Sequence, residues 1–214
     1  MIPLCKTSLG GKEKMDGSIF FMLLLNTAIS AWNAFACGSY LTESKLIGGW
    51  IRFLVWCGLV MSACGFTWVI AILMSFVGVS MEYLTREQGQ LLIEATYLFI
   101  LIPILGSGLG IWVHSIAQAY RTRKFGDIAV AAWNTYAQGS NMYHAAKDAP
   151  GAFSHVWDRL SDSFDSDDAG KVYMGAAFIM LVIIAAAAGV MLTAAIARWA
   201  DRRIAIEVSG TQPA

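Results

Sequence analysis

The chain has 214 residues, of which 57% are hydrophobic and only 14% charged, and its 15 Lys and Arg balance its 15 Asp and Glu. Its mean hydropathy of +0.57 is too high for an ordinary soluble domain. The zero net charge gives no reason to expect a nucleic-acid partner. Because the charges lie between long uncharged runs, we predict an all-α polytopic integral membrane protein. It should have about four transmembrane helices, with membrane lipid as one partner.

After a polar segment at residues 1–16, the first expected transmembrane helix covers residues 17–42, which carry no charge. A signal peptide cleaved after Ala34-Phe35-Ala36 is the alternative, but the apolar run continues too far and the basic start is long and mixed in sign. Asn26, Ser30, Asn33 and Cys37 share one face of this helix. They predict interhelical hydrogen bonds or, alternatively, a polar pathway lining.

The second expected span, residues 50–81, opens with Trp50, Arg52 and Trp56, which are typical anchors at a membrane interface. Residues 53–81 are uncharged and would form a helix of roughly 44 Å, against a hydrocarbon core of about 30 Å. This helix must therefore tilt or project beyond the bilayer. Gly58, Ser62 and Gly65 form a small-residue face suited to close helix approach.

The third span, residues 95–120, contains Pro103 and three nearby glycines (Gly106, Gly108 and Gly110) and predicts an interrupted helix. An interruption is tolerated in lipid only where neighbouring helices or a water-filled cavity satisfy the backbone. Gly106 and Gly110 form a GxxxG contact pattern, and His114 continues that face. The candidates for helix packing or for a pathway are therefore Asn26, Asn33, Pro103, Gly106, Gly110 and His114.

Residues 121–171 are expected to form an extramembrane or partly re-entrant loop. Residues 128–146 carry no Asp, Glu, Lys or Arg but several Asn, Gln, Ser and Thr side chains, too many for a typical span. Pro150 and Gly151 are expected to end this stretch. An amphipathic helix at residues 151–164 then follows, with Asp158 and Asp162 on its polar face. This acidic face predicts docking on a protein partner or, alternatively, shallow burial at a leaflet that does not attract cations. The apolar stripe of the helix, the partner-docking candidate, consists of Phe153, Trp157, Leu160 and Phe164.

The fourth span covers residues 172–199 and is followed by a short tail, residues 200–214. Four spans place seven Lys and Arg on the side of the termini and eight on the other side, so the positive-inside rule does not decide the orientation. The basic clusters Arg121–Lys124 and Arg198–Arg203 both favour the cytoplasm, yet one span separates them. A fifth crossing or a re-entrant passage by residues 128–146 would satisfy both, but the polarity of that stretch favours four. The basic edge at Arg198–Arg203 predicts a cytoplasmic C-terminus, in the plasma (inner) membrane.

No residue pattern predicts a catalytic, cofactor or metal site. The three histidines lack ligand spacing, and the acidic turn at Asp165–Gly170 lacks two ligands of a calcium loop. The cysteines are expected to be reduced, buried thiols. We therefore expect a non-enzymatic subunit of a larger secretion, conjugation or envelope machine, with other membrane subunits or copies of itself as partners. The alternative is a small channel or transporter that uses the broken helix around Pro103–Gly110.

Overall fold

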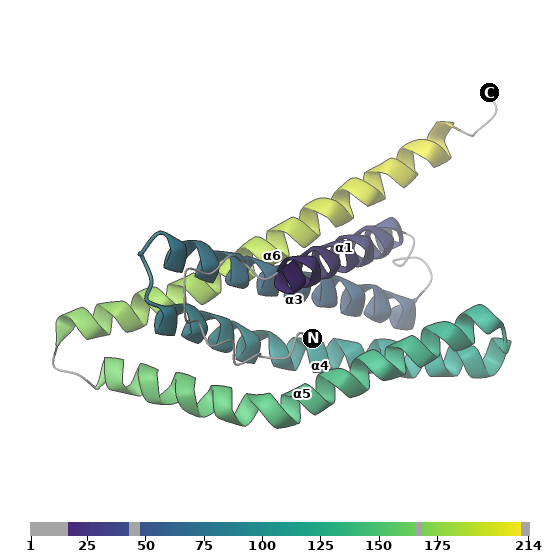
Figure 1. The fold of residues 1–214 in the computed structure, drawn as a ribbon. Helices are drawn as coiled ribbons and strands as arrows, with labels where there is room; N and C mark the ends of the chain where they lie inside the picture. The colour runs from purple at the N-terminus through teal and green to yellow at the C-terminus, as the bar shows by residue number, and fades with distance from the viewer. Residues whose placement is uncertain (1–16, 43–47, 166–167, 211–214) are drawn as a thin grey trace.

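The computed structural model describes residues 17–42, 48–165 and 168–210, with side chains described as far as Arg203. Five helices and no strand occur in these ranges (Figure 1): α1 (Gly17–Ser39), α3 (Gly49–Ser80), α4 (Arg86–Thr122), α5 (Phe125–Phe164) and α6 (Ala169–Gly210). Four of them, α1, α3, α4 and α6 as far as Arg203, are long and apolar enough to span a membrane. The prediction of an all-α, multi-pass membrane protein is confirmed.

The predicted interruption at Pro103–Gly110 is wrong, because α4 is continuous from Arg86 to Thr122. It also begins nine residues earlier than expected. Thr85 caps it: its hydroxyl accepts from the Gln88 backbone N–H at 3.2 Å, and the Gln88 side chain accepts from the Thr85 N–H at 2.8 Å. At the proline, the Ser107 hydroxyl donates to the Pro103 carbonyl at 2.5 Å. Helices packed on both sides hold such a segment helical where its sequence alone would loosen it.

The expected break at Pro150 and Gly151 is also wrong. Residues 128–146 and 151–164 belong to a single 40-residue helix, α5, and Pro150 lies inside it. The helix changes direction partway along its length (Figure 1), as a proline without an N–H donor favours. It follows α4 after a tight turn in which Arg123 is left-handed, with φ 52°. α4 and α5 therefore form one long helical hairpin.

α5 lies antiparallel to α4 along its whole length. Next to the hairpin turn, the Trp112 indole donates to the Thr135 hydroxyl at 2.8 Å, and at the far end Arg159 pairs with Glu87. α3 packs on α4 and contributes Trp68 to a buried cluster with Tyr97 and Ile100 of α4 and Ala152 of α5. A second cluster joins Leu92 of α4 to Phe178 and Val182 of α6.

Small residues set the spacing of α1, α3 and α6. A Cβ at Gly58 or Gly65 would collide with side chains of α1, and one at Gly38 would lie 2.5 Å from the Ala197 Cα atom. A Cβ at Gly189 of α6 would lie 2.7 Å from the backbone nitrogen of Thr67. These helices therefore approach each other at backbone distance, which is how membrane helices gain van der Waals contact.

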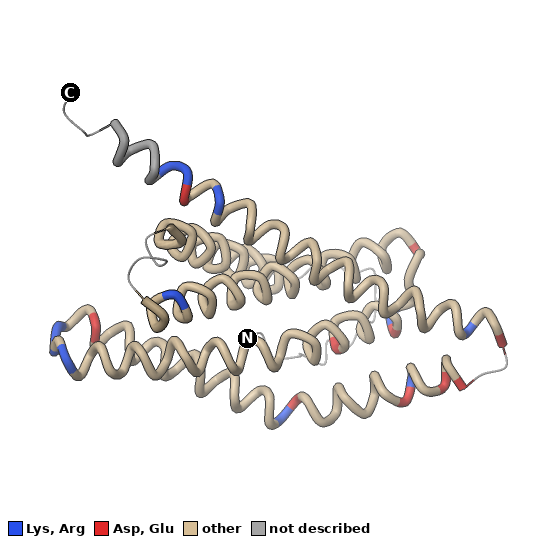
Figure 2. The backbone as a smooth tube through the Cα atoms, turned by 180° about the vertical axis from the view of Figure 1, so that it is seen from behind, with Lys and Arg blue, Asp and Glu red and all other residues tan. Residues whose placement is uncertain are grey.

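The two ends of the bundle differ in charge (Figure 2). Trp50 at the start of α3 contacts His114 near the end of α4, and Thr42 after α1 bonds Asp201 of α6, so these segments share one end. This basic end carries Arg52, Arg121, Arg123, Lys124, Arg198, Arg202 and Arg203 against Asp127 and Asp201. The opposite, acidic end carries Glu82, Glu87, Glu94, Asp158, Asp162, Asp165 and Asp168 against Arg86, Arg159 and Lys171.

Candidate functional site: a polar seam between α4 and α5

Side-chain hydrogen bonds and ion pairs line the contact between α4 and α5, which we call the polar seam. From the basic to the acidic end it comprises Trp112–Thr135, Gln138–Leu105, His144–Asp148, Glu94–His155 and Glu87–Arg159. Except for His144–Asp148, which lies within α5, each pair joins the two helices. The seam is the largest set of polar contacts between helices in the described part of the chain.

α5 turns its polar residues inward and its aromatic residues outward. Gln138 is only 5% and Asn141 only 9% exposed, whereas Trp133 is 63% and Tyr136 71% exposed. The Gln138 amide donates to the Leu105 carbonyl at 3.2 Å and packs directly on Gly108, where a Cβ would collide with it. A helix in water places its polar face outward, so α5 has the opposite pattern.

An acid–base pair lies on the acidic side of the seam. The carboxylate of Glu94, which is 8% exposed, lies 2.5 Å from His155 Nδ1 and accepts a hydrogen bond from Gln90 at 2.8 Å. Nearer the middle of the seam and within α5, His144 Nδ1 lies 3.0 Å from Asp148. Because a buried carboxylate requires such partners, the Glu94–His155 contact holds α5 in one register on α4.

Two further polar atoms are buried beside this pair. The Trp68 indole N–H and the Tyr97 hydroxyl have no hydrogen-bond partner among the described residues, and their rings pack edge to face at 6.1 Å. Both belong to the cluster that contains Ala152 of α5. The described ranges hold no group of three His, Cys, Asp or Glu side chains arranged to bind a metal ion. The chemistry that this site offers is hydrogen bonding between carboxylate, imidazole and amide groups.

The structure does not bring the predicted packing and pathway candidates together. Asn26 donates to the Gly65 carbonyl at 3.4 Å, and Asn33 is half-buried on α1. Pro103 lies within the continuous α4, and a Cβ at Gly106 would meet open space. Gly110 packs against Phe53, and His114 Nδ1 accepts from the Trp50 indole at 3.2 Å. These contacts join α1 and α4 separately to α3.

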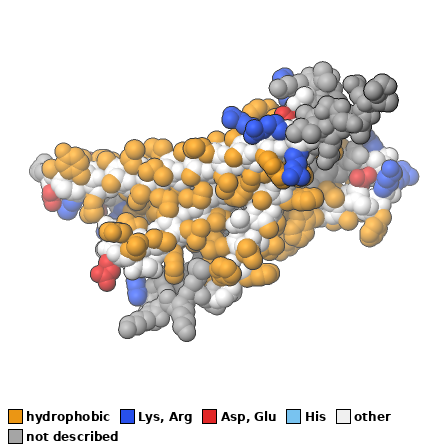
Figure 3. All heavy atoms as spheres, turned by 90° about the horizontal axis from the view of Figure 1, so that it is seen from above, with side chains coloured by type: hydrophobic (Ala, Val, Ile, Leu, Met, Phe, Trp, Pro, Cys, Tyr) orange, Lys and Arg blue, Asp and Glu red, His pale blue; other side chains and the backbone are white. Residues whose placement is uncertain are grey.

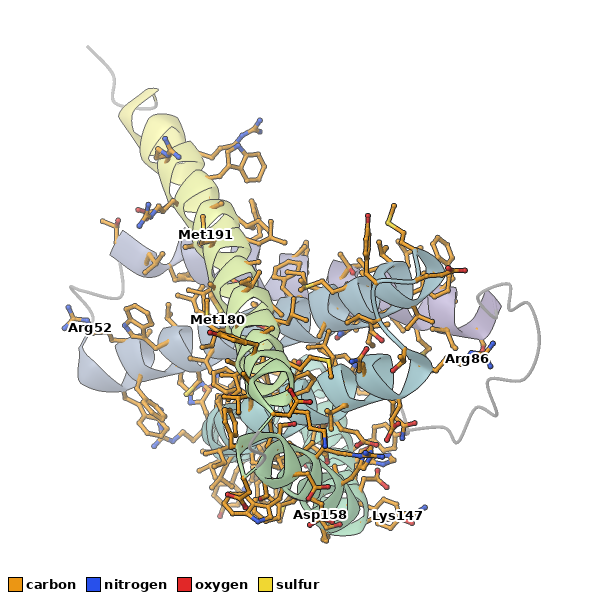
Figure 4. The ribbon with its side chains drawn as sticks, turned by 90° about the vertical axis from the view of Figure 1, so that its left-hand side faces the viewer. Arg52, Arg86, Lys147, Asp158, Met180 and Met191 are labelled. Atoms are coloured by element: carbon orange, nitrogen blue, oxygen red, sulfur yellow. The ribbon has the colours of Figure 1, made fainter. Side chains whose placement is uncertain are left out.

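The predicted docking stripe of α5 is divided between two environments. Phe153 and Trp157 are exposed and stack on each other, with ring centroids 6.1 Å apart. Leu160 packs instead on the cluster around Leu92, and the Phe164 ring lies against Gly175 of α6. Lys147 and Asp158 project from α5 away from the other helices (Figure 4).

Sequence reasoning missed the residues of the seam. Glu94 falls just before the expected third span, although it lies two turns inside α4. The available signal was a repeat at i, i+3, i+10 and i+17, which places Gln138, Asn141, Asp148 and His155 on one face of a helix. An expected break at Pro150 concealed that repeat. Nothing matches this chain in comparisons with protein-family models, with curated proteins and with solved structures.

Proposed function

We propose that the protein is a non-enzymatic integral membrane subunit with five crossings that packs in a larger membrane assembly. The observation that carries this proposal is the polar seam, because α4 would satisfy the inward polar groups of α5 if α5 crossed the membrane. The uncharged stretch of α5, residues 128–146, begins at the hairpin tip, and its part from Tyr136 onward lies beside the membrane stretch of α4, since Gln138 bonds the Leu105 carbonyl. The outward side chains of that part, Tyr136, Met142 and Tyr143, are exposed. Polar groups that face the bundle and apolar groups that face outward are what a bilayer requires.

The charge asymmetry supports one orientation. With α5 as a crossing, Arg121–Lys124 and Arg198–Arg203 share one side, which removes the conflict that four spans leave. Lys and Arg then number eight on this side and seven on the other, so the orientation rests on these two dense clusters, which favour the cytoplasm of a plasma (inner) membrane for the basic end and the C-terminus. The acidic end and the start of α1 lie on the opposite side.

The helices are also longer than one bilayer can cover. Phe53 of α3 lies beside Gly110 and Trp68 beside Tyr97, so the uncharged stretches of α3 and α4 overlap only over residues 95–110 of α4. That overlap corresponds to about 24 Å, less than the core of about 30 Å. The end of α4 and the start of α5 therefore project beyond the hydrocarbon at the basic end.

The projecting tip of the hairpin exposes apolar surface. Tyr120 and Ile128 are exposed there, and Phe125 is 87% exposed beside Arg121, Arg123 and Lys124. Apolar side chains outside the hydrocarbon mark protein-interaction sites. Hydrophobic side chains also cover the face of the bundle seen in Figure 3. We assign the tip to an acidic surface of another subunit and the bundle face to lipid.

The alternative of a channel or transporter depended on an interrupted third span. Because α4 is continuous through Pro103 and Gly110, that support is gone and we do not propose this function.

The test combines topology with assembly. In a Cys5→Ser background, a Thr211→Cys variant in intact cells should resist an impermeant thiol reagent from outside, whereas native Cys5 should react with it. Native mass spectrometry should then show a complex larger than the single chain that is lost with Phe125→Ser. The control Phe21→Ser changes an exposed residue on the apolar helix α1 and should keep the complex. A single-chain mass for the wild-type protein would overturn the assembly, and external labelling of the Thr211→Cys variant would overturn the topology.

A further inference from the structure

A cavity of about 400 Å³ opens at the basic end between the start of α3 and the last turns of α4. Its lining consists of Trp50, Val113, His114, Ala117, Gln118 and Arg121. This volume is in the range of small-ligand sites. The lining has an apolar part, Val113 and Ala117, and a polar part formed by the other four side chains.

The polar part offers donors and positive charge. Because the Trp50 indole donates to His114 Nδ1, a neutral His114 ring carries its proton on Nε2 and can donate from there. Arg121 has no ion-pair partner among the described residues, and Gln118 adds an amide. Gly48, the N-cap of α3, has no side chain to cap the helix, and the first turn of α3 carries no acidic residue. The positive end of the α3 dipole therefore adds to the charge of Arg121.

The inner part of the cavity, at Trp50, Val113 and His114, lies at the depth of the lipid headgroups. The shared uncharged stretch of α3 and α4 ends at Phe53 and Gly110, and the cavity begins at the next turn. The headgroup layer occupies roughly 5–7 Å beyond the core on each side, or about one helical turn. The Arg121 backbone lies about 16 Å beyond Gly110, and its long side chain extends back into the cavity that His114 also lines. A phosphate bound there could place acyl chains along the apolar lining and the exposed Ile116 beside it.

We infer that this cavity binds the phosphate-bearing headgroup of an anionic lipid in the leaflet at the basic end. Arg121 and the His114 Nε2–H contact the phosphate, Gln118 orients the headgroup, and Trp50 closes the side toward α3. Basic pockets between transmembrane helices on the cytoplasmic side are suited to such headgroups. The proposed topology decides only which leaflet supplies the lipid, and in that respect alone the inference rests on the proposed function.

The test uses the full chain in nanodiscs of phosphatidylcholine, titrated with phosphatidylglycerol and followed by native mass spectrometry and thermal unfolding. Arg121→Gln should weaken phosphatidylglycerol binding about fivefold, the effect expected of one basic side chain near an anionic surface. Trp50→Phe keeps the ring, removes the N–H that orients His114, and should weaken binding as well. Arg202→Gln is the matched control: it removes the same charge at the same end, from a residue of α6 outside the cavity.

Retained binding in Arg202→Gln with weakened binding in the other two variants would support the inference. Equal weakening by Arg121→Gln and Arg202→Gln would overturn it, because only the general charge of that end would then matter. Displacement of the lipid by glycerol phosphate at equal concentration would keep a phosphate site but overturn the lipid as its ligand. Nanodiscs present the same lipid on both faces and hold a single chain. The measured lipid affinity therefore does not depend on the orientation of the chain or on its partners, so it is valid even if the topology or assembly experiment contradicts the proposed function.

Discussion

Adding one methyl group at Gly108 tests whether α5 packs its polar face on α4. A Cβ there would lie 3.2 Å from the Gln138 side-chain carbon and closer still to its amide oxygen. Since Gln138 is buried and bonded to the Leu105 carbonyl, the amide cannot move aside without losing that bond. Gly108→Ala should therefore push α5 away from α4.

Gly106 offers a matched control two residues away on the same helix. A Cβ at Gly106 meets open space, so Gly106→Ala gains the same helix propensity without a collision. Both variants gain the same helix propensity, so this gain cancels in the difference between their free energies of unfolding. That difference then has two contributions, a lost hydrogen bond and overpacking. The lost interhelical hydrogen bond costs about 0.6 kcal/mol on average, and overpacking costs about 1–3 kcal/mol. Gly108→Ala should therefore be less stable than Gly106→Ala by about 1.6–3.6 kcal/mol.

Reversible unfolding in mixed detergent micelles measures this difference. Adding Gln138→Ala to Gly108→Ala should restore much of the lost stability, because the colliding amide is removed. Equal stability of Gly106→Ala and Gly108→Ala would refute the reasoning. Gln138 would then not pack on Gly108, and the inward polar face of α5 would have no support at this point.

Three further predictions concern the remaining contacts. Glu94→Gln and His155→Gln should each lower the free energy of unfolding, with a coupling of about 1.5–3 kcal/mol in a double-mutant cycle; additive effects would mean that the two side chains do not interact. Gly189→Ala should cost about 1–3 kcal/mol in the same unfolding assay, because its Cβ meets the backbone of α3, while Gly139→Ala in open space should cost nothing; equal values would contradict the close contact. Trp157→Asp should release a partner docked on α5 without unfolding the bundle, as seen by native mass spectrometry, whereas Trp157→Phe should retain it; a complete complex with Trp157→Asp would exclude docking at this face.

Much of the architecture follows from the sequence. Uncharged runs of more than 20 residues predict membrane helices from composition alone, and the structure contains four such helices at the expected places. The small-residue face of α3 at Gly58 and Gly65 predicts a close contact, and α1 packs there. The bond from Asn26 to the Gly65 carbonyl is one of the interhelical hydrogen bonds that the polar stripe on α1 indicates. In each of these cases the residues that support the prediction all lie on one helix, so the pattern can be recognised along the sequence.

The course of α4 and α5 was decided by tertiary structure. Pro103 and Pro150 are helix breakers by local propensity, yet both lie inside helices whose neighbours hold the backbone in place. Hydropathy averages over all faces of a helix, so the polar residues of 128–146 count against a membrane position wherever they point. Only the packing of α5 on α4 shows that Gln138 and Asn141 point inward, and that Glu94 meets His155 from a position 61 residues away in sequence. Two helices must lie side by side before polar side chains on either one can be satisfied, and a pattern read along one helix does not contain that pairing.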